Sequence, residues 1–247
     1  MYRFLRIVQR DTINLFINPM WLFFGIGFPF LLTAVLGVLN EGVYGNSITS
    51  YDYYGVTMLL YSTLYAATFS ANSFLEERIR QPNLRIIYSP IKKFYIPLSK
   101  IIATFLFTTV FYTIAGGILH IILGVNFGSA HLGKIWALFL AVDFFFSCVG
   151  VLMCCLFKSE GVANQIIGIV TTLFAILSGL FFPIASLGEQ VVAVSKFSPI
   201  TKVVDLIFSL IYDTATTGFF KTMCLLIGVS MLLILCCGGL FKGEDYL

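Results

Sequence analysis

The stretch that decides the fold is EERIRQPNLRIIYSPIKKFYIPLSK at residues 76–100, followed directly by IIATFLFTTVFYTIAGGILHIILGV at 101–125. The first part is the one sizeable charged island between long apolar segments. The second is an uncharged run long enough to cross a lipid bilayer, since about 20 helical residues span its hydrocarbon core. The island carries six basic residues, and basic residues next to spans resist translocation. We therefore expect residues 76–100 to form a cytosolic loop.

Composition agrees with a membrane protein. Of the 247 residues, 59% are hydrophobic and only 11% are charged, which leaves too little polar surface for a soluble globule of this length. We predict an all-α membrane protein whose single domain covers residues 1–247. The six expected spans are Met20–Leu39, Tyr53–Leu75, Ile101–Val125, Ile135–Phe157, Val162–Pro183 and Thr222–Phe241.

The basic residues orient these spans. Of the 15 Lys and Arg residues, only Lys134, Lys196, Lys202 and Lys221 fall on one face, and the other eleven, including every arginine, fall on the opposite face. By the positive-inside rule the second face is cytoplasmic, and an even number of spans places both termini there. The net charge of +3 thus reflects topology, and we expect no nucleic-acid partner.

Two segments are expected to lie along the membrane surface. Residues 1–18 place apolar side chains opposite Arg3, Arg6 and Arg10, which predicts an interfacial amphipathic helix that contacts lipid. A signal peptide is the alternative, and residues 37–41 lack its cleavage pattern. Residues 184–220 hold apolar runs too short to cross, which predicts a re-entrant helical segment in the outer leaflet.

Few residues within the spans suggest chemistry. No nucleotide-binding GxxxxGK[ST] pattern occurs, so any ATP must be hydrolysed by another chain, and we predict no catalytic or metal site. Asp143 is the main intramembrane candidate, because a carboxylate in a span is costly and normally faces a bundle interior. Its alternatives are a structural hydrogen bond, to Thr171 or Thr172 for example, and direct contact with a transported molecule. His120 is a weaker candidate, since it has no matched partner.

The second expected span is unusually polar for a segment that must insert into a bilayer. Its hydroxyls and amide suit either a helix–helix interface or a pathway for an amphipathic molecule, and both interpretations stay open. The candidate pathway residues are Tyr61, Tyr65, Thr68, Asn72 and, from the fourth span, Asp143.

Two motifs resemble those of the membrane subunit of ATP-binding-cassette (ABC) exporters of the type-2 class. Glu76-Glu77-Arg78 followed by Ser89-Pro90-Ile91 and Ser99-Lys100 is similar to that family's turn and coupling helix before the third span. Ser178-Gly179-x-x-x-Pro183 and later Phe197-Ser198-Pro199-x-Thr201 are similar to the end of the fifth span and its returning segment. The resemblance covers nearly the whole chain.

The resemblance implies a mechanism. Two such permease subunits, as identical copies or as paralogues, pair in a cell membrane that is expected to be bacterial, and each docks a separate ATPase that binds ATP and magnesium. The residues expected to meet the ATPase are Glu76, Glu77, Arg78, Arg85, Ser89, Pro90, Lys92 and Lys93. The residues expected to form an outer gate are Ser178, Gly179, Pro183, Ser198, Pro199 and Thr201.

The expected cargo is a drug, an antimicrobial peptide or another amphipathic molecule moved outward. Export of a polysaccharide or lipid-linked polymer by the same class is one alternative. A secondary carrier driven by an ion gradient is another, although the chain lacks the paired intramembrane charges typical of one. A membrane scaffold or enzyme is a third, although only Asp143 and His120 could act in catalysis.

Overall fold

The computed structural model describes residues 2–42, 44, 48–75, 94–184, 188–196, 198–213 and 216–241, among which all regular structure is helical. Short helical turns cover Phe23–Gly27, Ser129–His131 and Ser209–Asp213. The helices are α1 (Tyr2–Ile17), α2 (Pro19–Leu22), α3 (Phe28–Leu39), α4 (Ser50–Leu64), α5 (Ala66–Leu75), α7 (Tyr95–Leu123), α8 (Leu132–Phe157), α9 (Glu160–Leu177), α10 (Glu189–Ser195), α11 (Pro199–Phe208) and α12 (Phe219–Leu240).

Five helical segments of the described chain are long and apolar enough to cross a membrane. They are Pro19–Leu39, Tyr95–Leu123, Ser129–Phe157, Glu160–Leu177 and Phe219–Leu240. Each coincides with an expected span, so five of the six spans have helices of the predicted type and position. The chain is therefore a multi-pass membrane protein by length and composition.

The remaining expected span, Tyr53–Leu75, is not one continuous helix. α4 ends at Leu64 and α5 begins at Ala66, with a turn at Tyr65 between them. The Ser62 carbonyl accepts from the Tyr65 amide at 3.0 Å, one residue early for an α-helix, and from the Tyr112 hydroxyl of α7 at 2.5 Å. The neighbouring Thr63 hydroxyl donates to the Leu60 carbonyl at 2.7 Å, so side chains and backbone compete for the same carbonyls at this point.

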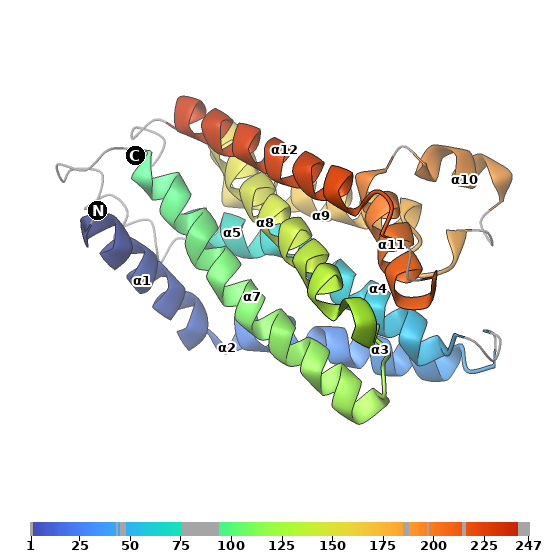
Figure 1. Ribbon diagram of the computed structural model, residues 1–247. Coiled ribbons are helices and arrows are strands. Elements are labelled where there is room, and N and C mark those ends of the chain that lie inside the picture. Colours follow the sequence, from blue (N-terminus) through green and yellow to red (C-terminus); the bar gives the residue numbers. More distant parts are fainter. Residues whose placement is uncertain are drawn as a thin grey trace.

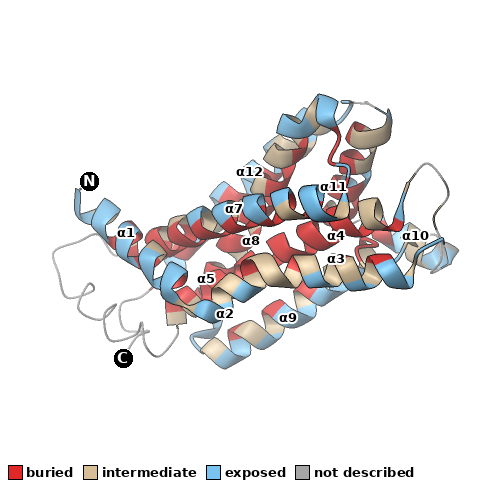
Figure 2. Cartoon of the chain, turned by 90° about the horizontal axis from the view of Figure 1, so that it is seen from below, coloured by how far each residue is buried: buried red, intermediate tan, exposed pale blue. Residues whose placement is uncertain are grey.

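α8 forms the centre of the bundle. In the most apolar part of α8, 67% of the residues are buried, whereas the corresponding fraction in α12 is 17%. α8 packs against α4, α5, α7, α9 and α12. Figure 2 shows the buried residues gathered along α8, α4 and α5. Gly150 allows the closest approach, because a Cβ at this position would lie 2.0 Å from the Ala67 carbonyl oxygen of α5.

α1 lies along α7 rather than apart from the bundle (Figure 1). Ile7, Val8, Asp11 and Leu15 are its buried residues, and the Phe16 ring lies 5.3 Å from that of Phe107. Much of the predicted apolar face therefore packs on protein. Apolar side chains such as Leu5 remain exposed beside it, as an interfacial helix needs.

Two predicted boundaries are wrong. α7 starts at Tyr95, so residues 95–100, which were expected in the cytosolic loop, belong to this helix. α9 ends at Leu177 and not at Pro183, because Gly179 adopts a left-handed φ of 68°. The Leu180 amide then donates to the Ala175 carbonyl and the Gly179 amide to Ile176, the paired bonds of a Schellman helix end.

The start of α1 and the end of α12 lie at the same end of the molecule (Figure 1). This placement agrees with an even number of crossings. α10 and α11, which fall within the expected re-entrant segment 184–220, lie at the opposite end of the molecule (Figure 1). α11 contacts α8, α9 and α12, and it buries Ile200, Thr201, Val203 and Ile207 among others.

Candidate functional site

Four of the candidate pathway residues form one stripe along α4 and α5. Tyr61, Tyr65, Thr68 and Asn72 follow one another at helical intervals of three and four. Tyr65, Thr68 and Asn72 are half-buried, whereas the residues between them on α5, from Ala66 to Ala71, are otherwise buried. The partly exposed side of α5 between Tyr65 and Asn72 is therefore polar, although most of the helix is buried in the bundle.

The stripe continues onto α9. The Asn164 amide donates to the Asn72 side-chain oxygen at 2.6 Å, and this hydrogen bond joins the two helices. Gly168 and Thr172 follow Asn164 at four-residue intervals, and both are exposed. We call this set, Tyr61, Tyr65, Thr68, Asn72, Asn164, Gly168 and Thr172, the α5–α9 seam. It presents hydroxyls and amides on the surface of an otherwise apolar bundle.

Asp143 lies apart from the seam, inside the packed interface of α7 and α8. Its carboxyl is 1% exposed and accepts a hydrogen bond from the Thr108 hydroxyl at 2.8 Å. The other carboxyl oxygen has no protein partner among the described residues. It borders a cavity of about 10 Å³, with room for at most about one water, beside Thr109 and Tyr112.

The predicted partners of Asp143 are wrong: the hydrogen bond goes to Thr108, and the Thr171 hydroxyl bonds to the Ile167 carbonyl of its own helix. Of the two open interpretations, this geometry favours a structural hydrogen bond.

Three expected gate residues meet in one hydrogen-bonded cluster. The Ser178 and Ser198 hydroxyls lie 2.8 Å apart, and the Thr201 hydroxyl lies 3.2 Å from that of Ser178. Ser198 also caps α11, because its hydroxyl accepts from the Thr201 amide, and Pro199 follows as the first helical residue. We call Ser178, Ser198 and Thr201 the hydroxyl cluster. It joins the end of α9 to the start of α11.

The other two gate residues lie nearby. The Gly179 carbonyl accepts from the Tyr53 hydroxyl of α4 at 2.5 Å. Pro183 lines a cavity of about 380 Å³ between the ends of α3 and α4, together with Tyr44, Tyr54 and Phe182. The Phe181 ring packs 4.8 Å from that of Tyr61, so the segment 178–183 touches the Tyr61 end of the seam.

Comparison with known protein families shows to which family this chain belongs. A family model described as ABC-2 type transporter matches residues 2–212, which include α1 to α11. The chain belongs to the ABC-2 type transporter family. No curated protein matches the chain in the corresponding search.

Membership of the ABC-2 family confirms the resemblance seen in the sequence and makes the chain a transport permease rather than an ATPase. The match ends within the helical turn that follows α11. α12 lies beyond it but packs against α8, and so belongs to the same helical body.

The eight predicted ATPase-coupling residues fall within 76–93, outside the described residues. The structure describes what flanks them. Leu75 is the last residue of α5, and Phe94 directly precedes α7. The Phe94 ring packs closely on α12, because a Cβ at Gly238 would lie 2.5 Å from this ring.

One site in this ABC-2 chain was missed. The Lys100 ammonium of α7 lies 2.6 Å from the Asp11 carboxylate of α1, and the Ser99 hydroxyl donates to the same carboxylate at 3.2 Å. Lys100 is 1% exposed and Asp11 is 6% exposed, so this ion pair is withdrawn from water. A sequence signal existed, because Asp11 lies four residues after Ile7 and four before Leu15, on the buried face of α1.

Proposed function

We propose that this chain is the permease subunit of an ABC exporter, which moves an amphipathic cargo outward with energy from ATP hydrolysed on a separate subunit. The observation that carries the proposal is the ABC-2 family match over residues 2–212 on a multi-pass helical bundle. The ATP and magnesium sites then belong to the partner. This chain supplies the path and the contact with the motor.

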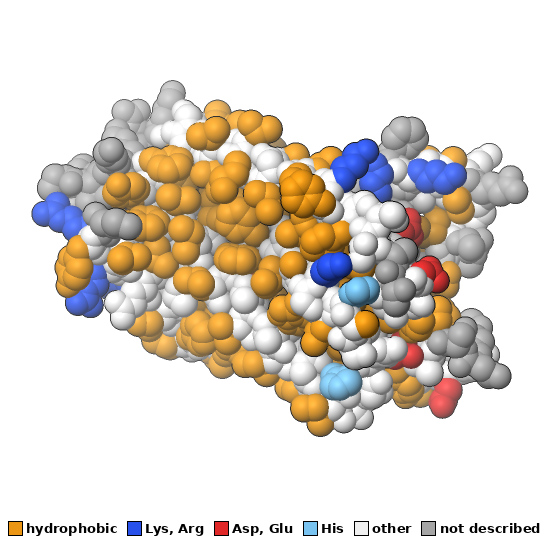
Figure 3. Space-filling view, viewed as in Figure 1, with side chains coloured by type: hydrophobic (Ala, Val, Ile, Leu, Met, Phe, Trp, Pro, Cys, Tyr) orange, Lys and Arg blue, Asp and Glu red, His pale blue; other side chains and the backbone are white. Residues whose placement is uncertain are grey.

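The proposed topology has six crossings. Five are the apolar helices already described, and α4 with α5 forms the sixth as one span interrupted at Tyr65. On the face shown in Figure 3, acidic side chains gather only toward the α10–α11 end, while basic side chains lie at both ends. Together with Arg3, Arg6 and Arg10 on α1, this distribution supports a cytoplasmic placement of the α1 end in the cell membrane. α10 and α11 are then the re-entrant outer segment.

The proposed contact with the ATPase is the segment 76–93, and the helices on either side of it are packed into the bundle. α5 and α7, which lead into and out of this segment, both pack against α8. The Asp11–Lys100 ion pair adds α1 to these helices. A push on the segment is therefore transmitted to three helices together instead of being absorbed by a loose loop.

The proposed cargo path follows the α5–α9 seam, with a second permease copy or a paralogue facing it. Polar groups on an otherwise lipid-like surface are costly unless they meet protein, water or cargo. The aromatic rings of Tyr61 and Tyr65, with the Asn72 amide, suit a molecule that is part apolar and part polar. The hydroxyl cluster closes the outer end of this path.

A pull-down from the native membrane in mild detergent, followed by mass spectrometry, tests the proposal. We expect a stoichiometric partner that carries a GxxxxGK[ST] motif. The double charge reversal Glu76→Lys/Glu77→Lys should lose this partner, while the control Glu41→Lys, an exposed acid at the opposite end, should keep it. A clean preparation of the unmodified chain without any ATPase would contradict the proposal.

A further inference from the structure

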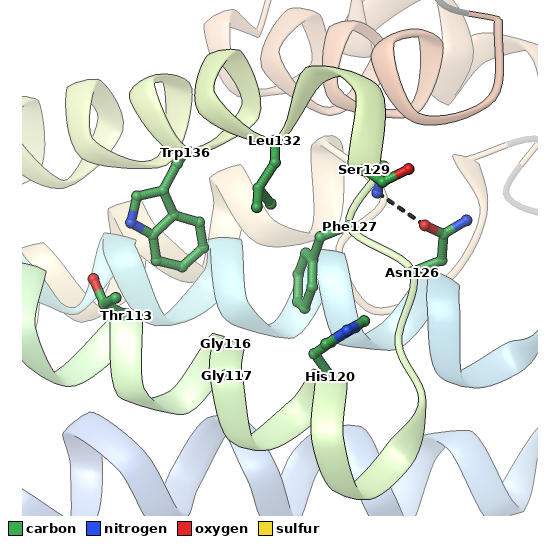
Figure 4. A pocket seen from close by; sticks show the side chains of 10 residues that line it. Thr113, Gly116, Gly117, His120, Asn126, Phe127, Ser129, Leu132 and Trp136 are labelled. Carbon is green, nitrogen blue, oxygen red and sulfur yellow. Dashed lines mark hydrogen bonds between the residues drawn. The ribbon is translucent and has the colours of Figure 1, made fainter.

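A cavity between α7 and α8 contains none of the residues considered so far except His120. It has a volume of about 420 Å³, within the range of small-molecule sites, and it opens on the surface of the bundle. Its walls come from the last turns of α7, the loop 124–128 and the first turns of α8 (Figure 4). We call it the α7–α8 groove.

Adjacent glycines on α7 create the groove. A Cβ at Gly116 would lie 2.8 Å from the Trp136 ring, so this glycine lets the ring of α8 lie against α7. A Cβ at Gly117 would meet no atom within 4 Å, so this position faces open space. The pair thus brings the two helices together on one side and leaves a channel on the other.

The groove has an apolar end and a polar end. Trp136 lines it toward the middle of the bundle, beside Thr113, whose hydroxyl already donates to the Thr109 carbonyl of its own helix. His120, Asn126 and Ser129 line it where α7 ends and α8 begins (Figure 4). His120 Nδ1 lies 2.9 Å from the Val125 carbonyl oxygen, an acceptor, so Nδ1 carries the proton and Nε2 is left for another partner. The Asn126 side-chain oxygen accepts from the Gly128 amide at 2.9 Å, which leaves its amide group as a donor.

This order of chemistry matches one class of ligand. α7 and α8 are both long enough to span the membrane, so the apolar end lies at the depth of lipid chains and the polar end at the level of lipid head groups. We propose that the α7–α8 groove binds one acyl chain of a membrane phospholipid, with the ester and phosphate oxygens next to His120, Asn126 and Ser129. The site is independent of the proposed transport function, since it shares no residue with the seam or the hydroxyl cluster.

Trp136 provides a direct probe, because the chain has only two tryptophans, Trp21 and Trp136. In purified Trp21→Phe protein, the emission of Trp136 is followed while a lysophospholipid with a brominated acyl chain is added at constant detergent concentration. Bromine quenches an indole that it touches. We expect saturable quenching, which reports a site with a definite occupancy.

Matched leucine substitutions separate the groove from the general lipid surface. Gly117→Leu fills the groove and is expected to abolish the saturable phase. Gly228→Leu places the same side chain at an exposed, open position of α12 and is expected to leave the titration unchanged. Quenching that rises without saturation, or that is equal in the two leucine variants, would overturn the proposal.

His120→Ala tests the polar end separately, at an exposed position that does not depend on filling the groove. Loss of one hydrogen bond to the head group should raise the Kd of the brominated lysophospholipid by about fivefold to tenfold. An unchanged Kd would contradict the placement of the head group. This outcome is readable even if the Gly117→Leu protein does not fold.

Discussion

The Asp11–Lys100 ion pair joins α1 and α7 through two residues that are 89 positions apart in the sequence. Removing two charges from water is expensive, and the Coulomb attraction between them offsets that cost only when the geometry is good and other partners contribute. Here the Ser99 hydroxyl gives the carboxylate a second donor. The pair therefore fixes the position of α1 on α7 more than it adds net stability.

Breaking one half of this pair should be worse than removing both halves. Lys100→Met leaves a buried, uncompensated Asp11 carboxylate and is expected to cost about 3–5 kcal/mol of unfolding free energy. The double variant Asp11→Leu/Lys100→Met should recover most of that loss. Thermal unfolding in detergent measures both, with Arg6→Ala at an exposed position of α1 as the control. A double variant as unstable as Lys100→Met would contradict this account.

Asp143 is expected to act through Thr108. Thr108→Val and Asp143→Val each break the 2.8 Å hydrogen bond between α7 and α8, so their effects on stability should couple by about 1–3 kcal/mol instead of adding. Thr113→Val is the control, because that exposed hydroxyl bonds to the Thr109 carbonyl of its own helix. Additive effects on stability would contradict the hydrogen-bond account. A loss of transport with an unchanged amount of folded protein would also contradict it and would favour direct contact between Asp143 and the cargo.

At this scale the sequence located candidates better than it located partners. Asp143 was predictable, since a lone carboxylate in an apolar run must have a reason to be there. Its bond to Thr108 was not, because the partner is chosen by how α7 and α8 pack. Lys100 was assigned to the loop because it ends a charged stretch of sequence. Its burial depends on the packing of α1 against α7, which no local pattern reveals.

At the scale of elements, the length of the apolar runs predicted five helices correctly. It missed the interruption of the expected span Tyr53–Leu75, which forms α4 and α5. The turn at Tyr65 depends on the Tyr112 hydroxyl reaching the Ser62 carbonyl from another helix, which no local pattern reveals. The end of α9 could have been predicted, because a glycine such as Gly179 commonly ends a helix. The expected span was extended to Pro183 because the residues that follow Gly179 are apolar. The hydroxyl cluster shows that residues 20 or more apart in that motif do meet.

The hydroxyl cluster gives a test of the outer gate. Ser178 and Ser198 are close enough that cysteines at both positions should form a disulfide on oxidation. If α9 and α11 separate during each cycle, the cross-link should reduce transport to background, and a reductant should restore it. Ser178→Cys and Ser198→Cys alone are the controls. Full transport by the cross-linked protein would show that this contact does not open.

At the scale of the whole molecule, the bundle has a densely packed core and two ends to which we assign different roles. α8 is surrounded by other helices. The α1 end carries Arg3, Arg6 and Arg10 and leads to the segment that we propose contacts the motor, and the opposite end carries the hydroxyl cluster with α10 and α11. Charge and hydropathy predicted the cytosolic loop and the short apolar runs of 184–220, whereas the gate residues were implied by the resemblance to ABC exporters. The sequence did not predict that α1 belongs to the core, because an amphipathic helix fits a membrane surface and a protein surface equally well.

The energy source is the central claim of this account. The most direct measurement is uptake of an amphipathic fluorescent dye by inside-out vesicles that contain the chain and its copurified ATPase. We expect uptake that requires ATP, survives an ionophore that collapses ion gradients, and disappears in the Glu76→Lys/Glu77→Lys variant. Uptake that proceeds without ATP and stops when the ionophore is added would contradict the exporter and identify a gradient-driven carrier.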